Sequence, residues 1–83
     1  MQHIDAVKNI LADTLNLGER GQSLGPHSLL LGSLPELDSM AVINIITALE
    51  EYFGIAVHDD EISAQTFETL GSLAQFVEQK TAE

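Results

Sequence analysis

The sequence predicts an all-α fold, a bundle of three main helices and one short helix with a long first loop. Three separate segments carry apolar residues at the spacing of an amphipathic helix, and residues that favour helix ends lie beside them. The one candidate strand, Ile55–Val57, is too short to build a sheet. With 83 residues the chain is long enough for one domain, which we expect to span residues 1–83.

The first segment is an amphipathic helix that begins at Ile4 and ends near Gly18. Its apolar positions recur every three or four residues and are Ile4, Val7, Leu11 and Leu15. Residues 18–38 then hold four of the six glycines and both prolines, which predicts a long loop. A loop of this length is uncommon in a small domain. Five of its six leucines suggest that part of it folds back against the bundle: Leu24, Leu29, Leu30, Leu34 and Leu37.

The strongest helical segment follows the loop and runs from Ser39 to Phe53. Asp38 is a good N-cap, and Gly54 suits the position after the last helical turn. One face of this helix is apolar and is expected in the core: Val42, Ile45, Ile46, Leu49 and Phe53. The opposite face is exposed and nearly uncharged: Met40, Asn44, Thr47 and Glu51.

Two further helices are expected in the last third of the chain. The acidic run Asp59–Glu61 favours the start of a short helix. Thr69 can cap a final helix that ends in polar residues after Val77. The apolar stripe of this helix is Leu70, Leu73, Phe76 and Val77.

Composition limits the kinds of partner. Thirteen acidic and three basic residues give a formal net charge of −10, which repels nucleic acid and anionic lipid and attracts basic protein surfaces. No apolar run approaches the ~18 residues of a membrane span. The chain has no cysteine, and its start lacks the pattern of a secretory signal. We therefore expect a cytoplasmic monomer with protein partners, no membrane span and no nucleic acid.

No catalytic or metal site is predicted. The three histidines, His3, His27 and His58, lack ligand spacing. The acidic run Asp59–Glu61 is better explained as a solvated turn than as a cation site. A hydrolase would need an oxyanion hole and a substrate cleft, which so short a helical chain can hardly build. An Asp-Ser pair such as Asp38-Ser39 is by itself ordinary helix capping.

The sequence around that pair changes its interpretation. Leu37-Asp38-Ser39-Met40, followed by the helix that ends Ala48-Leu49-Glu50-Glu51-Tyr52-Phe53-Gly54-Ile55, strongly resembles the attachment motif and second helix of acyl carrier proteins. The resemblance extends over nearly the whole chain, because the helices and the long loop occur in the order of that family. It is closer to discrete carriers of dedicated pathways, polyketide or exosortase-associated, than to the housekeeping fatty-acid carrier.

The resemblance implies that Ser39 is esterified with 4′-phosphopantetheine, taken from coenzyme A by a phosphopantetheinyl transferase, and that Asp38 is the acid of the motif. The arm would hold acyl groups as thioesters for acyl-transferring or acyl-ligating enzymes, and the chain itself would not be an enzyme. The expected partner-recognition residues are Glu36, Met40, Ala41, Asn44, Thr47 and Glu51. An acyl chain could enter a pocket lined by Ile43, Ile46, Leu73 or Val77.

Two departures from the family pattern and two alternatives accompany this interpretation. Glu36 stands where the family commonly has glycine, with Pro35 before it, and Ala41 and Asn44 replace acids that familiar carriers place after the serine. A peptidyl carrier loaded with amino acids would share the fold and the serine. An unmodified helical interaction domain would share the fold alone.

Overall fold

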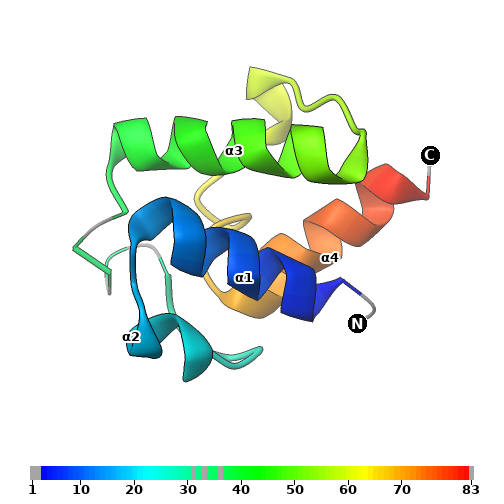
Figure 1. Ribbon diagram of the computed structural model, residues 1–83. Helices are drawn as coiled ribbons and strands as arrows, with labels where there is room; N and C mark the ends of the chain where they lie inside the picture. The colour runs from blue at the N-terminus through cyan, green and yellow to red at the C-terminus, as the bar shows by residue number, and fades with distance from the viewer. Residues whose placement is uncertain (1–2, 31, 33, 36, 83) are drawn as a thin grey trace.

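The computed structural model describes the whole chain except residues 1–2, 31, 33, 36 and 83. Its elements are α1 (Ile4–Leu15), α2 (Glu19–Gln22), α3 (Ser39–Phe53), the single 3₁₀ turn η1 (Asp59–Glu61) and α4 (Leu70–Thr81). In Figure 1, α1 and α3 run side by side in opposite directions, and α4 passes behind α1. The described residues contain no strand beyond one isolated bridge, so the predicted all-α fold is confirmed.

The first helix has the predicted face but ends earlier than expected. Val7, Leu11 and Leu15 are buried, as their spacing predicts. The helix ends at Leu15, because Asn16 takes a left-handed conformation with φ of 57° and its backbone N–H bonds to the Ala12 carbonyl. Asparagine is one of the few residues that tolerate this conformation.

A second short helix, α2, lies where the sequence predicts only loop. Its Gly21 is buried against α1, and a side chain added there would overlap the Cβ atom of Ala12. Close approach of the two backbones therefore requires glycine at this position. The four residues of α2 are too few to show helical periodicity. Their position is set by packing against α1.

The helix α3 has both predicted ends. The Asp38 side chain accepts a hydrogen bond from the Ala41 backbone N–H at 2.8 Å. Gly54 is left-handed, with φ of 66°, and its N–H bonds to the Glu50 carbonyl. The buried stripe is Ala41, Ile45 and Leu49. The other predicted core residues are only partly buried against that core: Val42, Ile46 and Phe53.

The long loop folds back onto the bundle, as its leucines predict. Leu30 and Leu37 are buried in the core. Leu29 contradicts the prediction, because it is 56% exposed. It forms an isolated bridge with Thr69, so the extended backbone turns Leu29 outward and Leu30 inward. Backbone hydrogen bonds hold this contact on both sides: Leu30 N to Glu68 O at 2.9 Å, Leu70 N to Ser28 O at 3.1 Å and Gly71 N to Pro26 O at 2.8 Å.

The last helix begins at a capping box. The Ser72 N–H donates to Thr69 Oγ1 and the Thr69 N–H donates to Ser72 Oγ, each at 3.0 Å. The buried face of α4 is Leu70, Leu73, Ala74 and Val77, and Phe76 is only partly buried. Together with α1 and α3 this face forms the core of the bundle. Within the described residues, no helix has both the length and the apolar character that crossing a bilayer requires.

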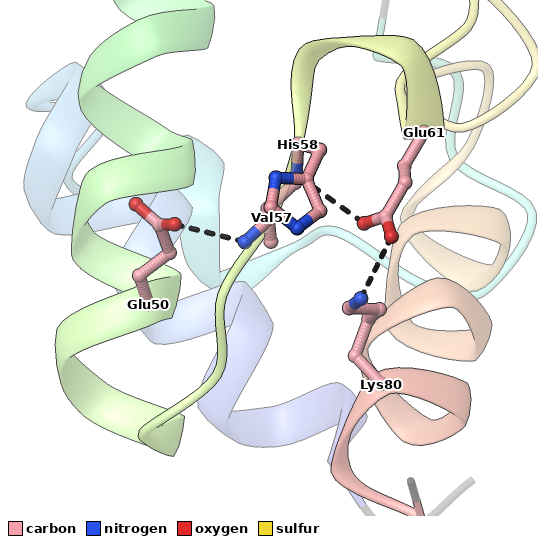
Figure 2. A network of polar contacts seen from close by, with 5 residues as sticks. All are labelled: Glu50, Val57, His58, Glu61 and Lys80. Carbon is pink, nitrogen blue, oxygen red and sulfur yellow. Dashed lines mark hydrogen bonds and ion pairs between the residues drawn. The ribbon is translucent and has the colours of Figure 1, made fainter.

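Polar contacts close the bundle where α3 ends (Figure 2). Glu50 Oε2 accepts a hydrogen bond from the Val57 N–H at 2.9 Å, which holds the chain leaving α3 against that helix. Lys80 Nζ donates to Glu61 Oε1 at 2.9 Å and thereby joins η1 to α4. The Lys80 side chain is 9% exposed and that of Glu61 is 30% exposed. The hydrogen bond from Lys80 lowers the pKa of the Glu61 carboxyl, and the His58 N–H, 3.3 Å from Oε2, acts in the same direction.

Candidate functional site

Ser39 is the first residue of α3, and its side chain is exposed where the long loop meets the helix. Asp38, extended with φ of −107° and ψ of −173°, brings the chain into the helix. Its carboxylate is engaged by the Ala41 N–H, and its carbonyl accepts from the Val42 N–H at 2.9 Å. Among the described residues no hydrogen bond joins Asp38 to the Ser39 hydroxyl. Asp38 therefore fixes the start of the helix.

The helix start suits an anionic group on Ser39. The first amides of a helix have no acceptor inside it, and the carboxylate of Asp38 occupies only that of Ala41. The N–H groups of Ser39 and Met40 lie in this first turn, at the positive end of the helix dipole. Among the described residues no acceptor pairs with these two amides, and an exposed serine beside them fits a phosphodiester better than a buried or fully paired serine would.

The expected recognition residues fall into three groups. Met40 is 66% exposed, and Asn44, Thr47 and Glu51 are exposed on the same face of α3. Thr47 Oγ1 donates to the Ile43 carbonyl at 3.0 Å, so its hydroxyl is partly used within the helix. Glu36 lies outside the described residues. We call Met40, Asn44, Thr47 and Glu51 the outer face of α3.

Ala41 contradicts the expectation of an exposed recognition residue. It is 8% exposed and packs into the core, because it lies four residues before Ile45 and eight before Leu49 on the buried stripe of α3. The prediction for Ile43 is wrong in the opposite direction. It was expected at an inner pocket but is 55% exposed, whereas Leu73 and Val77 are fully buried. Ile43 therefore adds apolar surface close to Met40.

Some residues with clear roles were not found from the sequence. Glu50 accepts a hydrogen bond from the Val57 N–H and so holds the chain that follows α3. The sequence identifies Glu50 only as an acidic residue of the helix and does not reveal this contact. Tyr52 is 66% exposed, which its place beside the apolar Phe53 does not reveal. Among the described side chains no group of three potential metal ligands comes together.

Comparisons with known proteins agree with this geometry. Residues 5–77 match the family described as the phosphopantetheine attachment site, so the chain belongs to that family. The acyl carrier protein of Picosynechococcus sp. is 31% identical over 77 residues, which cover 93% of this chain and 89% of that protein. A solution NMR structure of a holo acyl carrier protein from Nitrosomonas europaea is 70% identical, covers 100% of both chains and superposes with a TM-score of 0.93.

The function is that of an acyl carrier protein, and its cofactor is a covalently attached phosphopantetheine. Proteins of this family carry groups and do not transform them. The resemblance to dedicated-pathway carriers stays a prediction, because these relatives are named only as acyl carrier proteins.

Proposed function

We propose that Ser39 Oγ is the attachment point of the phosphopantetheine arm and that Asp38 positions it. The observation that carries this proposal is the exposure of Ser39 at the first position of α3, directly after the Asp38 cap. When bound, the arm supplies a thiol on which acyl groups travel as thioesters. Ser39 holds that arm at the edge of the bundle, where partner enzymes can reach it.

The loading step uses the serine as a nucleophile but needs a separate enzyme. Ser39 Oγ forms a bond to the phosphorus that carries the pantetheine part of coenzyme A, and the bond from that phosphorus to the adenosine bisphosphate part breaks. The hydroxyl proton must leave as the new bond forms. We expect the phosphopantetheinyl transferase to supply the base, since the carboxylate of Asp38 already accepts the Ala41 N–H at the helix start. We expect this loading reaction to take place in the cytoplasm.

Partner enzymes would approach Ser39 along the outer face of α3. Met40 on this face and Ile43 next to it give apolar surface beside the attachment point, while Asn44 and Thr47 add polar groups without charge. Such a surface favours contacts that salt screens weakly, in contrast to pairs of exposed charges. We expect a monomeric carrier that binds acyl-transferring or acyl-ligating enzymes transiently.

Intact mass spectrometry tests the attachment point. The apo chain is incubated with coenzyme A, Mg²⁺ and a phosphopantetheinyl transferase, and we expect a mass gain of one phosphopantetheine. Ser39→Ala should show no gain. The matched control is Ser23→Ala, since Ser23 is also exposed but lies outside α3, and this variant should be modified like the unaltered chain. Modification of Ser39→Ala would refute the assignment, and no modification of the unaltered chain would favour an unmodified interaction domain.

A further inference from the structure

A groove lies between α1 and α3, away from the attachment point. Its volume is about 350 Å³, and its lining residues are Ile10, Asp13, Thr14, Ala48, Glu51 and Tyr52. Three come from α1 and three from α3, so the two helices shape it where they run side by side (Figure 1). The small side chain of Ala48 leaves room between them. None of these residues except Glu51 was assigned a function from the sequence.

The lining combines apolar surface with negative charge. Ile10 and Ala48 are half-buried, and Tyr52 keeps 66% of its surface exposed. The carboxylates of Asp13 and Glu51 are both exposed. Within the described part of the chain neither carboxylate has a hydrogen bond or ion pair. An apolar hollow with two unpaired acids therefore stands open to solvent.

This chemistry selects one kind of occupant. An apolar side chain would fill the space above Ala48 and contact the ring of Tyr52, which removes apolar surface from water. A lysine or arginine one helical turn away would meet Asp13 or Glu51 and reduce their mutual repulsion in a chain of net charge −10. An acidic peptide, nucleic acid or anionic lipid would be repelled.

The groove is continuous with the outer face of α3, because Glu51 belongs to both. At 1.5 Å per residue, Glu51 lies about 18 Å along the helix from Ser39. A protein helix that docks beside Ser39 and follows α3 would therefore reach the groove with its far end. Contact at both places would fix the direction of the partner along the carrier, which contact at Met40 alone does not.

We propose that the α1–α3 groove is a second docking site, which receives from a partner enzyme a helix carrying an apolar residue one turn from a lysine or arginine. The proposal rests on the carrier function proposed above, since it concerns a partner of the loaded arm. It does not depend on which serine bears the arm, so mass spectrometry of Ser39→Ala and binding at the groove can fail separately.

A short synthetic helical peptide, with a leucine one turn from an arginine, is the probe. It is titrated into the ¹⁵N-labelled full chain, and amide shifts are followed by NMR. We expect shifts concentrated at Asp13, Ala48 and Tyr52. A second peptide of equal charge, with glutamine in place of leucine, should bind about tenfold more weakly, because it lacks the buried apolar group.

Two variants locate the binding. Ala48→Gln fills the groove without changing charge and should weaken the leucine peptide about tenfold, whereas Ala64→Gln, at an exposed turn elsewhere, should not. Asp13→Asn should weaken it more than Asp5→Asn, which removes the same charge from another exposed site on α1. Equal binding of the two peptides, or shifts spread evenly over the acidic surface, would mean attraction by net charge alone and would overturn the proposal. Unchanged binding to Ala48→Gln would do the same.

Discussion

The two ends of α3 differ in how firmly the rest of the molecule holds them. At the first end, Ser39 and Met40 are exposed, and the carboxylate of Asp38 accepts a hydrogen bond from the Ala41 N–H. At the last end, Gly54 turns the chain, Glu50 holds Val57, and the Glu61–Lys80 pair joins η1 to α4. One helix thus has an open end for chemistry and a closed end for stability. Function and stability are therefore expected to respond to mutation at opposite ends.

The largest expected effect on stability comes from the core beneath the closed end. Leu49 is 1% exposed, so Leu49→Ala should lower the free energy of unfolding by about 2–5 kcal/mol through lost burial and a cavity. Met40→Ala at the open end should cost far less, because Met40 is 66% exposed. Urea unfolding followed by far-ultraviolet circular dichroism measures both, since the chain has no tryptophan. Equal losses would show that the open end is as firmly held.

The second largest effect on stability is expected from Gly54, in the turn at the closed end. Gly54 has φ of 66° and no atom within 4 Å of an added side chain, so Gly54→Ala costs only the strain of a left-handed alanine, ~1–2 kcal/mol. Gly25→Ala is the control, because Gly25 also has free space but no positive φ. It should be neutral or slightly stabilising. A similar loss in both variants would contradict the backbone explanation.

At the open end, the cap has a smaller expected effect. Asp38→Ala removes the acceptor of the Ala41 N–H and should lower the free energy of unfolding by about 1 kcal/mol. Asp38→Asn keeps an oxygen at the cap and should recover most of that loss. The same urea titration compares the two. If both variants lose equally, the negative charge of Asp38 rather than its hydrogen bond stabilises the helix.

The smallest effect concerns pH at the closed end. The pKa of Glu61 is lowered in the folded chain by its hydrogen bond with Lys80, so the contribution of this carboxylate is complete near neutral pH and is lost as pH falls through the lowered pKa. Glu61→Gln should therefore unfold more easily than the unaltered chain at pH 7, and the difference should shrink in acid. Glu68→Gln, at an exposed acid elsewhere, serves as control. A difference that does not change with pH would exclude the ion pair as its cause.

Local chemistry explains which parts of the fold were predictable. Asp38, Gly54 and Thr69 were assigned correctly as helix ends, because an oxygen at the first end and a glycine at the last satisfy backbone needs that do not depend on the rest of the fold. The α2 helix was missed for the opposite reason. Its Gly21 packs closely against Ala12, and this contact exists only once α1 is folded.

The candidate site was predictable to a similar extent. The motif around Ser39 located a serine at the junction of loop and helix, and the structure places it there, exposed. Periodicity gave the outer face of α3 but not the full boundary of the buried face, so Ile43 was taken as inner. Ala41 was taken as a recognition residue from its place in the family pattern, although it lies four residues before Ile45 on the buried stripe. That boundary depends on where α1 and the loop lie. The α1–α3 groove depends on two helices at once and has no signal in either sequence segment alone.

The bridge between Leu29 and Thr69 has a consequence for folding. It joins segments far apart in the sequence, with the whole of α3 between them, and the hydrogen bonds of Leu30 and Leu70 lie on either side of it. Closing a flexible chain costs entropy, and the part of this cost that depends on length is ~3 kcal/mol for about 40 residues. The contact can therefore persist only when the core already holds both segments together. Amide hydrogen exchange at Leu30 and Leu70 should accordingly require opening of the whole domain, while the helix ends exchange by local fraying.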